Sequence, residues 1–245
     1  MNTERDTDKI YEQPQSKITP FSFTDEVASV FDDMARRSIP CYAQVQDAIA
    51  SVAGKCYKYN GVIYDLGCST GTSLYNIARR LQSNKLKLTG IDDAPAMVKQ
   101  CRQKLGQFNL KGQIEILQGD ISNFNYTHAE MFILNYVLQF ISPDKKPVLL
   151  DTLYRALPKG GVLFLSDKTI QETEQLNTLF TDVYYEFKVN QGYSELEISQ
   201  KREALENVLT PCTDKELMGL LKNAGFSSME IIVKHLNFTS IVAVK

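Results

Sequence analysis

The stretch Gly67-Cys68-Ser69-Thr70-Gly71 has residue types and a spacing that suit the binding of a nucleotide. It follows the apolar segment VIYDL at 62–66 and precedes an amphipathic segment, as expected of a turn between a buried strand and a helix. Glycine allows tight turning and close approach of the backbone to a ligand, and the helix N-terminus offers free N–H groups. Asp92 ends the next apolar run, 25 residues after Gly67. A carboxylate placed there can accept hydrogen bonds from both hydroxyls of a ribose.

Three kinds of site compete for this turn. A dinucleotide fingerprint requires GxGxxG, which the sequence GCSTGTS does not supply. The turn does match GxSxG, the nucleophile elbow of hydrolases, but it follows the first strand of the sheet, and His235 lies inside a closing strand. The third is an S-adenosylmethionine (SAM) site, with Asp65 in the strand, Asp92 at the ribose and Asp120 near the adenine. The glycine turn and the carboxylates that follow the next two strands occur in the expected order, and together they favour the SAM site. A glycine turn alone is a weak signal, because about half of such turns serve packing or bind another nucleotide.

Alternating strands and helices must position these residues. Short apolar runs alternate with amphipathic segments, at 62–66, 86–92, 113–117, 131–136 and 162–167. This alternation predicts parallel strands joined by crossover helices. Two later runs, 228–238 and 240–245, are too close together for a crossover and predict an antiparallel hairpin. The expected fold class is α/β, a doubly wound, mostly parallel seven-stranded sheet with added helices. It is similar to the SAM-dependent methyltransferase-like fold, from about residue 43 to the end.

The chain divides into a tail and one domain. Residues 1–23 are polar and predict a flexible or partner-dependent tail, and residues 24–245 predict a single SAM-binding domain. Helical spacing predicts two helices before the first strand, at 24–40 and 42–57. The strand and helix alternation stops near residue 168, and a mainly helical insertion is expected over about 168–208.

Composition excludes several classes of protein. The net charge of −2 is unlike that of a protein that binds nucleic acid directly. There is no apolar run long enough to span a bilayer and no secretory signal, so we expect a cytoplasmic protein away from membranes. The five cysteines are scattered without a metal-ligand spacing, which fits a reducing compartment and predicts no metal.

The stretch GYSELEISQKREALENVL, residues 192–209, places an arginine in an apolar stripe. On a helical wheel Ile198, Arg202, Leu205 and Leu209 fall in one narrow sector. A buried guanidinium requires an anion, since burial of an unpaired charge is costly. Alternatively, Arg202 extends past the stripe into solvent, or pairs with a glutamate of its own helix.

Several longer motifs resemble the carboxy-S-adenosyl-L-methionine synthase family over most of the chain. They are VFDDMARRSIPCY, YDLGCS, NYVLQF and, above all, NQGYSELEISQKREALENV. The resemblance implies a homodimer that binds SAM and converts it to carboxy-SAM, with prephenate as the carboxyl donor and phenylpyruvate as the second product. It also implies that carboxy-SAM passes to a tRNA-modifying carboxymethyltransferase, which builds oxyacetyluridine at the wobble position.

The resemblance also implies roles for individual residues. Arg202 would bind the new carboxylate and would reach the site from the neighbouring subunit, where a planar guanidinium can bind a carboxylate bidentately. The residues implied to bind the SAM moiety are Tyr42, Gly67, Cys68, Ser69, Asp92, Asp93, Asp120, Ile121 and Asn135. The chemistry implied needs positioning and a dry pocket more than an enzyme base, and neither histidine, His128 or His235, lies in a site motif.

Three positions depart from the family pattern. Cys41 stands where glycine is typical, Asp167 where glutamate is typical, and Val189 where arginine is typical. The departure at Val189 bears on the choice of donor. Two other functions remain open on the sequence. One is a SAM-dependent methyltransferase acting on a small molecule or tRNA, and the other is a non-catalytic SAM-binding subunit of a tRNA-modifying complex.

Overall fold

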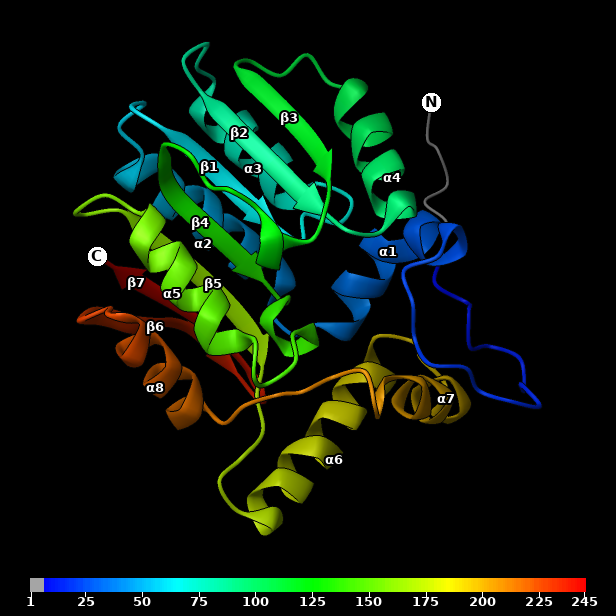
Figure 1. The fold of residues 1–245 in the computed structure, drawn as a ribbon. Coiled ribbons are helices and arrows are strands. Elements are labelled where there is room, and N and C mark those ends of the chain that lie inside the picture. The colour runs from blue at the N-terminus through cyan, green and yellow to red at the C-terminus, as the bar shows by residue number, and fades with distance from the viewer. Residues whose placement is uncertain (1–6) are drawn as a thin grey trace.

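A computed structural model describes residues 7–245 as three layers, with a seven-stranded sheet between two layers of helices (Figure 1). The strands are β1 (Val62–Leu66), β2 (Lys87–Asp92), β3 (Gln113–Gln118), β4 (Ala129–Asn135), β5 (Val162–Lys168), β6 (Ser228–His235) and β7 (Phe238–Val244). Their order is β3-β2-β1-β4-β5-β7-β6. β1 to β5 are parallel, and β7 is antiparallel to both β5 and β6. The predicted fold class is confirmed, including the antiparallel C-terminal hairpin.

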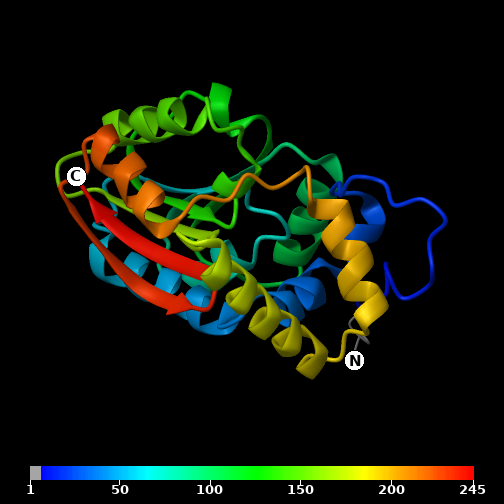
Figure 2. The same cartoon turned by 90° about the horizontal axis from the view of Figure 1, so that it is seen from below.

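Helices cover both faces of the sheet and one end of it. The α-helices are α1 (Asp25–Ser38), α2 (Tyr42–Cys56), α3 (Thr72–Leu81), α4 (Pro95–Gly106), α5 (Lys146–Ala156), α6 (Glu174–Asn190), α7 (Glu195–Leu205) and α8 (Asp214–Ala224). Two single 3-10 turns follow β3 and β4, at Ile121–Asn123 and Leu138–Phe140. α2, α3 and α4 pack on one face and α5 and α8 on the other, whereas α1, α6 and α7 lie beyond the carboxyl ends of the parallel strands (Figures 1 and 2).

Burial on both faces explains the near-continuous apolar runs of the central strands. In β4 and β5 almost every side chain is buried, and successive residues belong alternately to two core clusters. Met131 and Ile133 of β4 pack with α2, α3 and α4, whereas Phe132 and Leu134 pack with α5 and α8. A parallel strand covered on both sides needs apolar residues at odd and even positions alike.

Capping residues set the start of α7 and of α8. The Ser194 hydroxyl accepts the Glu197 backbone N–H, and the Glu197 carboxylate accepts the Ser194 N–H, which together form a capping box at the start of α7. Thr213 and Glu216 repeat this arrangement at the start of α8. Each box satisfies backbone donors that have no partner within the first helical turn, so these helices begin where the sequence places the caps.

The segment before α1 packs against the domain rather than forming a free tail. Asp8 is 2% exposed and pairs with Lys201 of α7 at 3.4 Å. The Gln200 side chain donates a hydrogen bond of 2.9 Å to the carbonyl of Tyr11, which is itself buried. The part of the tail from residue 7 onward therefore packs on the domain, because its polar groups have partners on a helix distant in sequence. Residues 1–6 of the same tail lie outside the described residues.

α7 buries a different cation from the one that the helical wheel selects. Lys201 is 6% exposed, whereas Arg202 is exposed and, within residues 7–245, makes no ion pair with Glu195 or Glu206. The helix ends at Leu205, so Leu209 does not continue its stripe. The prediction of a buried arginine is wrong for the single chain. The helix is rotated about its axis so that Lys201, the residue before Arg202, faces the body of the protein.

Cys41 adopts a left-handed backbone conformation, with φ +58° and ψ +24°, at the N-cap of α2. This region favours glycine, the residue typical of the family here, and a side chain adds about 1–2 kcal/mol of strain. We expect Cys41→Gly to raise the free energy of unfolding by about 0.5–1 kcal/mol, because glycine's extra entropy in the unfolded chain offsets part of that relief. Urea denaturation measures the change. Cys41→Ala keeps the Cβ atom, and an equal gain in that variant would contradict the explanation.

Candidate functional site

The glycine turn lies at the carboxyl end of β1, next to the end of β2. Gly67 and Cys68 donate backbone hydrogen bonds to the carbonyl of Ile91, at 2.7 and 3.0 Å. Gly67 has φ +69°, and a Cβ atom there would lie 2.6 Å from Cγ2 of Val137. Both the conformation and the available space therefore require glycine. The turn is fixed by its neighbours before any ligand is bound.

Asp92 holds the turn from the end of β2. One carboxylate oxygen accepts the backbone N–H of Ser69 at 2.8 Å, and the other accepts that of Ala94 at 3.0 Å. Ser69 has φ +51°, so this hydrogen bond helps to maintain a conformation that a non-glycine residue rarely adopts. Burial raises the pKa of Asp92 even though both N–H groups favour its ionised form. Contact between Asp92 and a ribose stays a prediction, and the structure adds a second, structural role.

α1 holds the same turn from the opposite side through Asp32. The Asp32 carboxylate accepts hydrogen bonds from the hydroxyls of Thr70 and Thr72, at 2.6 and 3.0 Å, and pairs with Lys104 at 2.5 Å. Burial alone would raise the pKa of Asp32, but Lys104 and the two hydroxyls lower it. Asp32 was not among the predicted site residues, although it lies in the motif VFDDMARRSIPCY.

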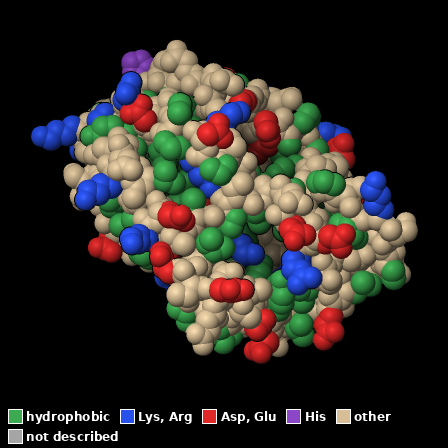
Figure 3. Space-filling view, turned by 60° about the horizontal axis from the view of Figure 1, so that its bottom comes forward, with side chains coloured by type: hydrophobic (Ala, Val, Ile, Leu, Met, Phe, Trp, Pro, Cys, Tyr) green, Lys and Arg blue, Asp and Glu red, His purple; other side chains and the backbone are tan. Residues whose placement is uncertain are grey.

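A cavity of about 640 Å³ opens beside the turn, between the strand ends and helices α1, α6 and α7. This volume lies within the range of about 300–1,000 Å³ that is typical of small-molecule sites. Figure 3, which brings the lower side of Figure 1 forward, shows basic and acidic side chains around a hollow there. The residues predicted to bind the SAM moiety all line this cavity: Tyr42, Gly67, Cys68, Ser69, Asp92, Asp93, Asp120, Ile121 and Asn135. Arg202, which was predicted to serve the neighbouring subunit, also lines the cavity of its own chain.

Two polar atoms in the cavity wall have no protein partner within the described part of the chain. Asp65 Oδ2 and Asn135 Oδ1 are both buried and without a hydrogen bond. Because buried polar groups normally have partners, these atoms fit a ligand that supplies donors, such as the ammonium group of SAM. Burial, and then the neighbouring Asp92 carboxylate, raise the pKa of Asp65 to about 7. Asp65 and Asn135 line the same wall as the turn, so the residues present fit a SAM molecule.

The opposite end of the cavity is basic. Lys168 at the end of β5, Lys188 of α6 and Lys201 of α7 all line it, and Arg202 lies at its exposed rim. These lysines were not among the predicted site residues, because hydrophobic periodicity treats a single lysine as solvent-exposed. The motifs themselves could have indicated two of them, because Lys201 immediately precedes Arg202 in SQKR and Lys168 is the last residue of SDK.

Residues 63–161 match the family described as a methyltransferase domain. Along nearly the whole chain, the protein is similar to carboxy-S-adenosyl-L-methionine synthases. That of Sulfurimonas denitrificans is 42% identical over 97% of this chain and 99% of the relative. That of Vibrio parahaemolyticus is 38% identical over 100% of both chains. The chain belongs to the carboxy-S-adenosyl-L-methionine synthase family. The resemblance that the sequence motifs indicated is confirmed, and this membership makes the chain a SAM-dependent transferase.

Solved structures support the same fold at much lower identity. Human N-acetylserotonin methyltransferase in complex with SAM matches with a TM-score of 0.61 at 18% identity, over 91% of this chain and 56% of the other. An O-methyltransferase family 2 protein of Planctomyces limnophilus, in complex with apigenin, matches with a TM-score of 0.63 at 18% identity, over 91% and 62%. The chain thus spans less than two thirds of these longer proteins. The likeness concerns the fold alone.

The departures from the family pattern lie outside the cavity lining. Asp167 is fully buried, its carboxylate accepts the backbone N–H of Gln139 at 3.1 Å, and burial raises its pKa to about 8. Val189 is 48% exposed and lies in a groove between α6 and α7 together with Arg202. Asp167 therefore supports Gln139, which lines the cavity, whereas Val189 faces away from it.

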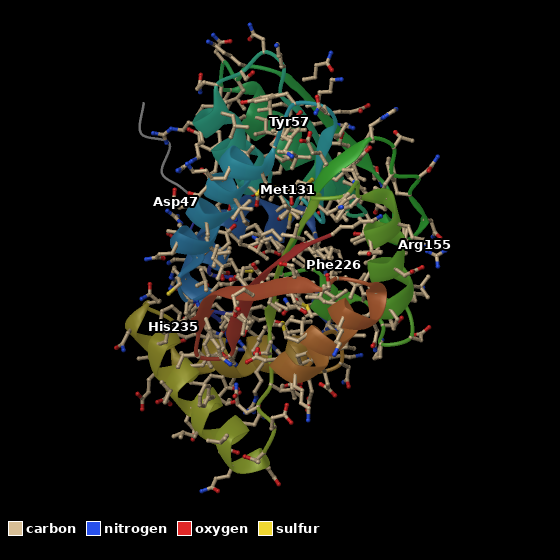
Figure 4. The ribbon with its side chains drawn as sticks, turned by 90° about the vertical axis from the view of Figure 1, so that its left-hand side faces the viewer. Asp47, Tyr57, Met131, Arg155, Phe226 and His235 are labelled. Carbon is tan, nitrogen blue, oxygen red and sulfur yellow. The ribbon has the colours of Figure 1, made fainter. Side chains whose placement is uncertain are left out.

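Neither histidine lines the cavity. His235 is exposed on the edge strand β6, as labelled in Figure 4. His128 is also exposed, in the loop before β4. Within residues 7–245 no group of three or more His, Cys, Asp or Glu side chains could hold a metal ion. Nor is any helix of the described residues long and apolar enough to cross a membrane.

The raised pKa of Asp65 predicts pH-dependent binding of SAM. The ammonium group of SAM favours the carboxylate form, whereas the free site holds its proton up to about pH 7. Binding therefore releases a proton at lower pH, and affinity should rise about fivefold from pH 6 to a maximum between about pH 7 and 8. At higher pH it should fall again, because the α-amino group of SAM loses its own proton. Isothermal titration calorimetry measures this. Asp65→Asn should bind more weakly with a flatter profile. If SAM affinity depended on pH equally in the wild type and in Asp65→Asn, Asp65 would be excluded as the cause of the pH dependence.

Proposed function

We propose that this protein converts SAM and prephenate to carboxy-SAM and phenylpyruvate. The observation that carries the proposal is the division of charge inside one cavity of a chain from the carboxy-SAM synthase family. Carboxylates from the ends of β1, β2 and β3 line one side, and ammonium groups from β5, α6 and α7 line the other. The acidic side suits the cationic SAM, and the basic side suits an anionic donor.

The reaction transfers the carboxyl group that prephenate loses to the methyl carbon of SAM. Prephenate loses carbon dioxide and hydroxide to give phenylpyruvate, carbon dioxide adds to the methyl carbon, and the displaced methyl proton leaves with hydroxide as water. The sulfonium of SAM makes these methyl hydrogens acidic. The protein's part is to hold both substrates in contact and to exclude water. The apolar and aromatic residues of the cavity wall, among them the partly buried Tyr42 and the buried Tyr184, support that role.

We further propose that two copies of the chain form a homodimer in which Arg202 completes the neighbouring site. Apolar side chains are exposed along α6 and the start of α7: Leu176, Leu179, Val183, Val189 and Leu196. Such a stripe on the surface is typical of a helix that packs against another subunit. Arg202 lies beside this surface and makes no ion pair among the described residues, so its guanidinium is available for a carboxylate.

The resemblance extends the proposal to the fate of the product. Carboxy-SAM would pass, in the cytoplasm, to a tRNA-modifying carboxymethyltransferase that completes the wobble uridine. The protein itself would bind small molecules and not tRNA, which is consistent with its net charge of −2.

Mass spectrometry of the ligand released from purified, denatured protein tests the function. A species heavier than SAM by the mass of carbon dioxide is the expected result, and incubation with SAM and prephenate should then release phenylpyruvate. Recovery of unmodified SAM or S-adenosylhomocysteine alone, with no phenylpyruvate formed, would contradict the proposal. That result would favour a methyltransferase.

A further inference from the structure

The basic end of the cavity contains two ammonium groups without a carboxylate partner. Lys188 is 5% exposed, and within residues 7–245 its Nζ has neither a hydrogen bond nor an ion pair. Lys168 is likewise without an anionic partner there, and both side chains line the cavity. Burial of an unpaired ammonium group is unfavourable unless a ligand supplies the anion. This arrangement is therefore the one expected of a site that binds an anionic ligand.

The third lysine of the cavity wall, Lys201, has an anionic partner within the protein. Lys201 pairs with the buried Asp8 at 3.4 Å and donates to the Ser38 hydroxyl at 3.3 Å. Asp8 also accepts a hydrogen bond of 2.6 Å from the Tyr193 hydroxyl. Lys201 therefore has an internal partner, whereas Lys168 and Lys188 do not.

Aromatic rings surround these two ammonium groups. Lys168 Nζ lies 5.0 Å from the ring centroid of Tyr184, and Lys188 Nζ lies 5.8 Å from the same ring and 5.4 Å from that of Tyr193. Phe238 packs on Tyr184 at 5.2 Å between centroids and also lines the cavity. This end of the cavity thus combines positive charge with aromatic surface, which suits an acid that carries a six-membered carbon ring.

The acidic and basic ends are electrostatically distinct. The charges that act on Lys188 are those of Lys201, Lys168, Asp8 and Glu197, and burial together with the two lysines lowers its pKa to about 7. The charge that acts on Asp65 is that of Asp92. Two cavity-lining ammonium groups of like charge, of which Lys188 is buried, favour a bound anion, since its charge offsets their repulsion and the cost of burial.

We propose that Lys168 and Lys188, with the Tyr184 ring between them, form the subsite that binds a carboxylate group of the donor acid. This inference rests on the proposed function and names the residues that contact the donor. The subsite does not include Val189, the position where the family resemblance predicts arginine. Val189 does not line the cavity, whereas the preceding Lys188 does.

Steady-state kinetics of Lys168→Met and Lys188→Met test the subsite. We expect each to raise KM for prephenate roughly 10- to 100-fold, because each loses a charge-assisted hydrogen bond, while Kd for SAM changes less than about threefold. Lys188→Arg should recover part of the loss. Lys222→Met is the matched control, because Lys222 is an exposed lysine of α8 outside the cavity. This variant also removes one positive charge, and it should leave KM for prephenate and Kd for SAM unchanged.

Direct binding separates failure of the subsite from failure of the proposed function. Calorimetry with phenylpyruvate needs no turnover, and the wild type should bind it more tightly than Lys188→Met. If the wild type binds phenylpyruvate through these lysines but makes no carboxy-SAM, the subsite stands and the proposed function fails. Turnover with unchanged KM for prephenate in both lysine variants, or weaker SAM binding instead, would overturn the subsite. Removal of a buried unpaired cation should not lower the melting temperature, so these variants are expected to fold.

Discussion

Asp92→Ala should weaken SAM binding by about 100-fold or more and lower the free energy of unfolding by about 3 kcal/mol, since two charge-assisted hydrogen bonds are lost. The Asp92 carboxylate is only 7% exposed and accepts the backbone N–H groups of Ser69 and Ala94. Without it, both donors lose their partners and nothing holds Ser69 in its left-handed conformation. The turn would then lose the backbone arrangement that shapes the cavity wall beside it. Calorimetry with SAM and urea denaturation measure the two effects.

Asp93→Ala is the matched control for Asp92. Asp93 is the neighbouring carboxylate and lines the same cavity, but its side chain is exposed and holds no backbone group among the described residues. We expect this variant to keep wild-type stability and to weaken SAM binding by about tenfold or less. If Asp92→Ala left stability unchanged, the structural role of the carboxylate would be wrong. Asp92 would then act on the ligand alone.

Arg202→Leu should abolish accumulation of carboxy-SAM and lower its rate of formation by about 100-fold or more, while SAM still binds. Arg202 is exposed at the cavity rim of its own chain and beside the groove between α6 and α7. A stability effect is not expected, because the side chain makes no ion pair within residues 7–245. Mass spectrometry of the released ligand should detect SAM alone. Persistence of the carboxylated species in this variant would contradict the role of Arg202.

Mixing two inactive variants tests whether Arg202 acts in the neighbouring subunit. If it does, a dimer of one Arg202→Leu chain and one Asp92→Ala chain contains one intact site out of two. After random exchange of subunits, about one quarter of wild-type activity should return, because half of the dimers are mixed. If each arginine serves its own chain, mixing should restore nothing. Each variant mixed with itself is the control for exchange.

Local sequence was sufficient to predict the sheet and the glycine turn. The apolar runs, the close spacing of the last two strands and the capping residues act over a few positions, so each element's type can be read from its own segment. The predicted binding residues at the ends of β1 to β4 also meet in one cavity. The reason is topological, since the carboxyl ends of parallel strands lie at one edge of a sheet and their following loops face the same crevice.

Tertiary contacts decided what periodicity could not. The sequence pattern selected Arg202 as the buried cation of α7, but Lys201 is buried instead, because Asp8, 193 residues away, provides its partner. Likewise Lys168 and Lys188 come from different elements, and only the packing of α6 against the end of β5 brings them to one ring, that of Tyr184.

The sequence by itself therefore determined the fold class, the family and the acidic side of the site, because local patterns and contiguous motifs encode them. Only the tertiary structure decided which lysines are buried, that the segment before α1 packs on α7, and that the cavity has a basic end. These features depend on pairs of residues far apart in the chain, and the burial of a charge depends on whether such a partner is within reach.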